Sequence, residues 1–128
     1  MENSFIDLII RIKNSYLSGR ESLISPHSNF REALTKKLKD LGYINDYHVQ
    51  GDAIKEIAID LKYHGKKPVI TDIKIMSKPG RRQYTSYKAL RPVVNNFGYS
   101  ILSTPKGLLT NKEAKKLKIG GELLFNIW

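Results

Sequence analysis

The chain has 128 residues, 41% of them hydrophobic and 27% charged, and its 22 lysines and arginines outnumber its 12 aspartates and glutamates, giving a net charge of +10. It contains no cysteine, which excludes disulfides, thiolate nucleophiles and cysteine-ligated zinc. No apolar run approaches the roughly 20 residues that span a bilayer, and the N-terminus has no signal-peptide core, so we expect a cytoplasmic protein with no membrane partner.

Two amphipathic helices are predicted in the first part of the chain. The first covers residues 4–17, where apolar side chains recur at the spacing of one helix face: Phe5, Leu8, Ile9, Ile12 and Tyr16. The second begins with Asn29 as its N-cap and stops at Gly42. Its expected buried face consists of Phe30, Ala33, Leu34, Leu38 and Leu41.

Three strands accompany these helices. Residues 22–25 predict a strand that Pro26 ends. Residues 43–49 and 57–63 predict a hairpin, because the second segment alternates apolar and polar side chains as a half-buried antiparallel strand does. Turn formers and a change in charge balance coincide at residues 64–68. We therefore expect two small subdomains, an N-terminal α-β-α-β-β unit over residues 1–66 and a basic, β-rich unit over residues 67–128.

The second unit is predicted to be mostly antiparallel β with short helices, which makes the fold class α+β. Strands are expected over residues 69–76, 99–103 and 122–128, with residues 81–84 pairing back on the first of them. Thr110 and Glu113 predict a capping box that begins a short basic helix. In this helix Ala114 and Leu117 are expected to face inward. A further short helix is expected from the apolar spacing of Leu90, Val93, Val94 and Phe97.

Basic residues are concentrated in the second half of the chain. Residues 1–61 contain 8 basic and 9 acidic side chains, whereas residues 62–128 contain 14 and 3. A basic surface of this kind is typical of a protein with a polyanionic partner. RNA, duplex DNA and an anionic membrane surface all carry many negative charges, so the charge of the protein alone does not distinguish between them.

The most distinctive motif is the hydroxyl-rich turn from Ser103 to Gly107. Ser103 and Thr104 offer hydroxyls, Lys106 offers a cation, and Gly107 permits a close backbone approach, a combination suited to phosphates and ribose hydroxyls. Taken alone, the same residues also describe an ordinary loop between a strand and a helix.

Three separated signatures resemble those of one known family, that of the eighth protein of the small ribosomal subunit. The first contains Asp7, Arg11, Ile12 and Asn14, and the second is Ser77–Gly80 with Tyr84 downstream. The third is Ser103–Leu109 followed by Glu113, Ala114 and residues 120–122. They occur in the family's order and at its total length, so the resemblance covers essentially the whole chain.

The resemblance implies a structural protein, not an enzyme, that has two small α+β subdomains and needs no cofactor, metal or small-molecule substrate. It implies direct binding to the central domain of small-subunit ribosomal RNA, support of its assembly, and contact with neighbouring ribosomal proteins, in a cytoplasmic or organellar ribosome. Translational repression through a mimic of the site on the operon messenger RNA is also implied.

The resemblance further implies which residues meet RNA. They are Tyr84, Ser103, Thr104, Lys106, Gly107 and Glu122, with Lys78 and Arg81 nearby. Glu122 is expected either to accept a hydrogen bond from a base or to orient the loop. Position 105 is commonly serine in the family and is proline here. Pro105 removes any contact of that serine and stiffens the turn.

Two other classes of function stay open on sequence alone. One is a small enzyme acting on a phosphorylated substrate at the Ser103–Gly107 turn, although no nucleophile with its base, no phosphate-binding glycine loop and no metal-ligand spacing is recognisable. The other is a DNA-binding or membrane-surface module, which competition among RNA, DNA and anionic vesicles would distinguish.

Overall fold

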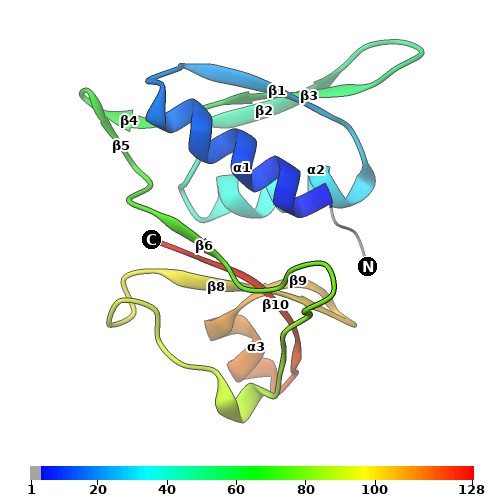
Figure 1. Cartoon of the computed structure of the whole chain (residues 1–128), viewed down its shortest axis with the longest axis vertical. Helices are drawn as coiled ribbons and strands as arrows, with labels where there is room; N and C mark the ends of the chain where they lie inside the picture. Colours follow the sequence, from blue (N-terminus) through cyan, green and yellow to red (C-terminus); the bar gives the residue numbers. More distant parts are fainter. Residues whose placement is uncertain (1–3) are drawn as a thin grey trace. The chain divides into compact units, whose positions relative to one another are not determined.

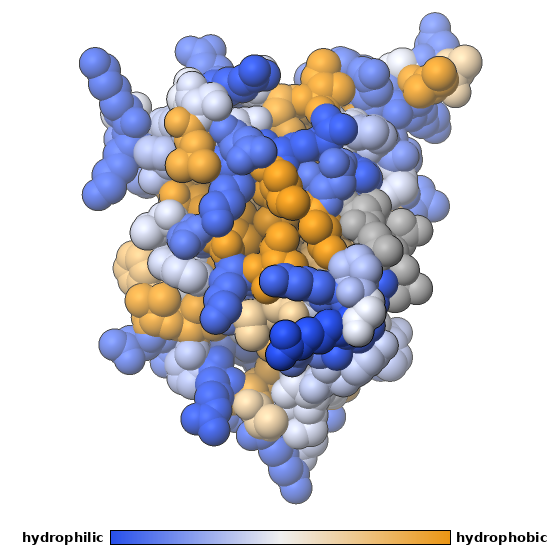
Figure 2. All heavy atoms as spheres, in the orientation of Figure 1, coloured by the Kyte–Doolittle hydropathy of each residue, from blue (hydrophilic) through white to orange (hydrophobic). Residues whose placement is uncertain are grey.

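The computed structural model describes residues 4–128, and the chain divides between Ile70 and Thr71 into two compact units. Helices and antiparallel sheet are combined in the first unit, and the second is mainly β (Figure 1). The predicted α+β fold class is therefore confirmed. Hydrophilic side chains project from the visible surface of both units (Figure 2).

The first unit has the predicted α-β-α-β-β order. Its elements are α1 (Ser4–Leu17), β1 (Ser22–Pro26), α2 (Asn29–Asp40), β2 (Asp46–Gln50) and β3 (Glu56–Asp60), followed by the short pair β4 (Tyr63–His64) and β5 (Lys67–Pro68). Strand β3 lies between β1 and β2 in an antiparallel sheet. Helices α1 and α2 pack together on one face of this sheet (Figure 1).

The first helix has the predicted bounds, and all five apolar residues of its predicted face are buried. The second helix differs in detail. Its N-cap is Ser28, one residue before Asn29, and the Ser28 hydroxyl accepts from the Arg31 amide at 3.0 Å. Ala33 is exposed, whereas Thr35 is fully buried and donates its hydroxyl to the Arg31 carbonyl oxygen at 2.7 Å. A buried threonine at this position is tolerated because its polar group is satisfied within the helix.

The predicted hairpin is confirmed as β2 and β3, although β2 begins at Asp46 and not at residue 43. Tyr43 and Ile44 are buried outside the strand. The Tyr43 amide donates to the Leu38 carbonyl oxygen at 2.9 Å, which ties this segment to the end of α2.

The second unit is built around its last strand. Its elements are β6 (Ile73–Ile75), β7 (Tyr84–Thr85), the short 3-10 helix η1 (Tyr87–Ala89), β8 (Tyr99–Thr104), β9 (Gly107–Thr110), α3 (Asn111–Leu117) and β10 (Gly121–Ile127). Strand β10 pairs antiparallel with β6, β7 and β8, and β8 continues into a hairpin with β9. Helix α3 packs against β8, β9 and η1 around the core residues Leu90, Leu102, Leu109 and Ala114.

The helical face predicted around residue 92 is wrong. Residues 90–98 form a loop in which Val94 and Phe97 are 52% and 78% exposed. Val94, Asn95 and Asn96 have positive φ angles of 47°, 54° and 70°, and the Phe97 amide bonds the Val94 carbonyl oxygen at 2.9 Å. The chain reverses direction here. The apolar residues recur at the spacing of a helix, but the backbone does not form one.

The expected orientation of Leu117 is also wrong, because its side chain is 54% exposed. Helix α3 ends there, and the next residue, Lys118, takes the left-handed conformation with φ of 58°. Ala114 faces the core as predicted, and the predicted capping box of Thr110 and Glu113 is confirmed by reciprocal hydrogen bonds of 3.1 and 2.9 Å.

Consecutive glycines allow β10 to approach its neighbours closely. A Cβ added to Gly121 would overlap the Ser103 carbonyl oxygen and lie 2.9 Å from the Thr104 methyl carbon. A Cβ on Gly120 would overlap the Thr85 carbonyl oxygen. Most of these obstacles are backbone atoms, which cannot move aside without distorting the sheet.

We predict that Gly121→Ala destabilises the protein by about 1–3 kcal/mol, the usual cost of overpacking. Urea unfolding followed by circular dichroism measures this change. Gly19→Ala is the matched control, because Gly19 has a φ of +69° but nothing within 4 Å of its added Cβ. Its loss should come from backbone strain alone, about 1–2 kcal/mol, and should be smaller than the loss in Gly121→Ala. Equal losses in the two variants would contradict a steric role for Gly121.

Candidate RNA-binding site on the second unit

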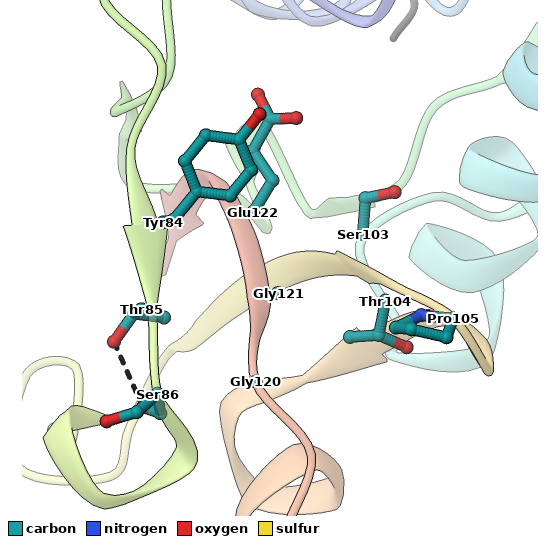
Figure 3. Close-up of a pocket in the computed structure, with 9 residues that line it drawn as sticks. All are labelled: Tyr84, Thr85, Ser86, Ser103, Thr104, Pro105, Gly120, Gly121 and Glu122. Carbon is teal, nitrogen blue, oxygen red and sulfur yellow. Dashed lines mark hydrogen bonds between the residues drawn. The ribbon is translucent and has the colours of Figure 1, made fainter.

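The antiparallel register brings together three residues that are far apart in the sequence. Glu122 of β10 pairs with Tyr84 of β7 on one side and with Ser103 of β8 on the other. Residues directly opposite one another in neighbouring strands point to the same face of a sheet. Figure 3 shows these three side chains on one face, in a row across the three strands.

A shallow depression of about 670 Å³ surrounds this row (Figure 3). Tyr84 stands at one side with 73% of its surface exposed, and the β8–β9 turn borders the other. The lining residues are Tyr84, Thr85, Ser86, Ser103, Thr104, Pro105, Gly120, Gly121 and Glu122. The two glycines that bring the strands close therefore also line the depression.

The hydroxyl-rich turn is a β-hairpin turn leading into β9, not a loop that leads directly into α3. The Thr104 hydroxyl donates to the Gly107 carbonyl oxygen at 2.8 Å and accepts from the Lys106 amide at 3.1 Å. Gly107 has a φ of +100°, a conformation that glycine adopts without strain. Pro105 lies between the paired residues Thr104 and Gly107, where its fixed φ suits a tight turn.

The two hydroxyls of the motif therefore differ in availability. Thr104 uses its one donor inside the turn, which leaves it a single free acceptor position. Ser103 is partly exposed, and its hydroxyl makes no hydrogen bond within residues 4–128. Of the two, Ser103 is better placed to donate to a ligand, whereas Thr104 shapes the turn.

Glu122 is only 5% exposed, and its carboxylate accepts a hydrogen bond from the buried Ser77 hydroxyl. Arg82 Nη1 lies 3.6 Å from the same carboxylate oxygen. The Ser77 hydroxyl in turn accepts from the Gln83 amide at 3.2 Å. Of the two roles expected for Glu122, this arrangement favours orienting the loop before β7 over direct contact with a base.

The remaining predicted residues lie outside the depression. Lys78 and Arg81 close a small turn of their own through backbone hydrogen bonds of 3.2 and 2.9 Å, and both are exposed. Lys78 and Arg81 thus pair with each other. We expected residues 81–84 to pair back on β6, and they do not. Lys106 and Gly107 are exposed on the β8–β9 turn, next to the lining residue Pro105.

Sequence reasoning missed two lining residues, Thr85 and Ser86. The Thr85 hydroxyl donates to the Ser86 carbonyl oxygen at 3.1 Å (Figure 3). Together with Tyr84 they form a run of hydroxyl-bearing residues like that of Ser103 and Thr104. This similarity is the sequence feature that could have identified them as lining residues.

The side chains of the site offer a ligand hydrogen bonding, stacking and charge. Within residues 4–128 no group of three histidine, cysteine or acidic side chains is arranged to hold a metal ion. None of the helices in the described part of the chain has the length and apolarity to cross a membrane.

Known proteins match the chain over nearly its whole length. The model of the family described as ribosomal protein S8 matches residues 3–128. Small ribosomal subunit protein uS8 of Mycoplasmopsis synoviae is 44% identical over 95% of this chain and 94% of its own length. Protein uS8c of Tupiella akineta is 41% identical over 95% of both chains, and uS8 of Ectopseudomonas mendocina is 38% identical over 100% and 98%. The chain therefore belongs to the ribosomal protein S8 family, a family of structural proteins of the small ribosomal subunit and not of enzymes.

Proposed function

We propose that this chain is a structural constituent of the small ribosomal subunit that binds the central domain of its ribosomal RNA directly, in a cytoplasmic or organellar ribosome. The observation that carries the proposal is the row of Tyr84, Glu122 and Ser103 across three strands, with Lys106 on the adjoining turn. The unit that presents it, residues 71–128, contains 11 basic and 3 acidic side chains.

The shape of the site suits RNA better than duplex DNA. The major groove of an A-form helix is too deep and narrow for side chains, so proteins use its shallow minor groove, its ribose hydroxyls and its unstacked bases. The free Ser103 hydroxyl lies in a shallow depression, where it can hydrogen-bond to a ribose 2′-OH. The exposed Tyr84 ring offers a stacking surface for a base. Lys106 favours a phosphate, and Lys78 and Arg81 add exposed cations on the neighbouring turn.

Support of assembly follows from such binding. A protein that binds the folded form of an RNA segment, and not its unfolded form, stabilises the fold by mass action. Neighbouring ribosomal proteins would then meet an RNA helix that is already ordered, and the nearly neutral first part of this chain leaves room for contacts with them.

We predict that Tyr84→Ala weakens binding to the ribosomal RNA site by about 1–3 kcal/mol through loss of stacking. Tyr84→Phe keeps the ring and should bind almost as tightly as the wild type. Filter binding or calorimetry with a central-domain transcript measures both variants, and unfolding curves establish that they fold. If Tyr84→Phe loses as much affinity as Tyr84→Ala, the ring does not stack on a base.

Lys106→Ala should instead change the salt dependence of binding. Loss of one phosphate contact lowers the slope of log affinity against log salt by about 1. The control is Lys36→Ala, which removes an exposed cation from α2 in the other unit and should leave the slope unchanged. Equal slopes for Lys106→Ala and the wild type would show that Lys106 does not meet a phosphate. Tight binding to duplex DNA or anionic vesicles at the same salt would favour the competing classes of function.

The proposal includes translational repression, in which the same surface binds a mimic of the ribosomal site on the operon messenger RNA. We predict that the two RNAs compete for the protein and that Tyr84→Ala lowers the affinity for each RNA by the same factor. Competition titration with a labelled ribosomal transcript tests this. Failure of the messenger segment to bind better than an unrelated hairpin would remove the regulatory role and leave ribosomal binding intact.

A further inference from the structure

Ser77 begins the second of the three sequence signatures, yet its side chain is fully buried. A buried hydroxyl cannot touch RNA, so the proposed site gives Ser77 no contact with a ligand. The turn that follows it carries two exposed cations, Lys78 and Arg81. The role of Ser77 must therefore lie in the structure that its hydroxyl stabilises.

The loop of residues 77–83, which connects β6 to β7, is fixed at both ends to β10. The Ser77 amide donates to the Leu124 carbonyl oxygen at 3.2 Å, and the Leu123 amide donates to the Gln83 carbonyl oxygen at 2.8 Å. Leu124 lies where the register between β10 and β8 shifts. An irregularity of this kind redirects backbone groups away from the regular ladder, and here one of them serves the loop.

A buried chain of hydrogen bonds crosses the base of the loop. The Ser77 hydroxyl donates to the Glu122 carboxylate and accepts from the Gln83 amide at 3.2 Å, so one side chain links the two ends of the loop to β10. A buried carboxylate is costly unless it is paired. Arg82 Nη1, 3.6 Å from this carboxylate, supplies the opposite charge. The charge of Arg82 is thus directed at Glu122, which leaves the other two cations of the loop to a ligand.

Lys78 and Arg81 are partners across a tight turn. Pro79 and Gly80 occupy its corners, and Gly80 has a φ of +74°, the combination that a type II turn favours. Directly opposite residues of an antiparallel bridge point to the same side, so the turn holds two like charges together. Neither side chain forms an ion pair within residues 4–128. An anion bound by both side chains would remove their repulsion.

The position of the turn in the chain favours a nucleic-acid phosphate as that anion. Tyr84 follows the loop directly, so fixing the loop also fixes the cations relative to the exposed ring. A nucleotide carries both a base that stacks on a ring and a phosphate that accepts from lysine and arginine. An acidic peptide offers the charge without the base.

We propose that Ser77 and Glu122 are positioning residues for RNA binding, which hold the 78–81 turn so that Lys78 and Arg81 bind the phosphate backbone together. The proposal rests on the proposed function, because the RNA bound beside Tyr84 supplies the phosphate. A turn that is ordered in advance loses little conformational entropy when RNA binds. Without the link through Ser77, the RNA would have to order the turn, and affinity would fall.

The test uses the full chain, a central-domain ribosomal transcript, and the variants Ser77→Ala and Ser100→Ala. Each variant removes one buried hydroxyl that donates to a side chain of β10, since Ser100 donates to Asn126 Oδ1 at 2.6 Å. Of the two, only Ser77 belongs to the cationic loop. We expect Ser77→Ala to bind roughly tenfold more weakly. Its salt slope should be lower by about 1–2 although no charge is removed. Ser100→Ala should keep the wild-type affinity and slope.

Two further measurements separate positioning from a general loss of stability. Urea unfolding establishes that the variants are folded under the binding conditions. In the free protein, ¹⁵N order parameters of the Gly80 and Arg81 amides should fall in Ser77→Ala and not in Ser100→Ala. Wild-type order parameters in Ser77→Ala would show that the turn does not depend on Ser77, and the proposal would be wrong.

Glu122→Gln tests the same link without altering Ser77. The substitution removes a negative charge, which by itself strengthens attraction to RNA. We nevertheless expect weaker binding, because Arg82 loses its ionic partner at the base of the loop. Equal or tighter binding by Glu122→Gln would overturn the positioning role.

The outcomes separate this proposal from the proposed function. If the wild type binds and Tyr84→Ala weakens binding, but Ser77→Ala keeps the wild-type slope, the positioning role is wrong and RNA binding stands. If the wild type does not bind the transcript, the proposed function fails and this proposal with it. Adding Ser77→Ala to the Lys78→Ala, Arg81→Ala double variant should cost little further affinity, because no cation of the turn is left to position. Losses that multiply would show that Ser77 acts by another route and would overturn the proposal.

Discussion

The pairing of β10 with β6, β7 and β8 is the constraint on which the candidate site depends. This strand places residues 84, 103 and 122 in one row. Gly121 at its start and Gly120 just before it allow the neighbouring backbones to approach until no side chain fits between them. Both glycines also line the depression. The site is thus a property of the sheet and not of the hydroxyl-rich turn alone.

Polar groups around the site divide into those that build it and those that remain available to a ligand. Glu122 and Ser77 are buried against each other and fix the loop before β7, and Thr104 closes the β8–β9 turn. Tyr84, Ser103 and Lys106 stay wholly or partly exposed. A surface whose shape is set by internal hydrogen bonds meets its ligand with little reorganisation, which preserves affinity.

Net charge and local charge differ in this protein. Residues 71–128 are strongly basic, which suits long-range attraction of a polyanion. The first part of the chain is nearly neutral, yet Arg11 of α1 and Arg31 of α2 share the single carboxylate of Asp7, so the surface is locally cationic. Specific contacts depend on such local arrangements because salt screens charges separated by more than about 10 Å.

Features that arise from local interactions could be predicted from the order of the residues. The bounds of α1, the hairpin of β2 and β3, and the capping box at Thr110 were all predictable, because their hydrogen bonds and apolar periodicity lie within a few residues. The burial of Glu122 against Ser77, the exposure of Phe97 and the alignment of Tyr84 with Ser103 are set by the packing of the folded chain. These outcomes depend on which strands pair and in which register, and contacts between segments tens of residues apart leave no periodic signal in the chain.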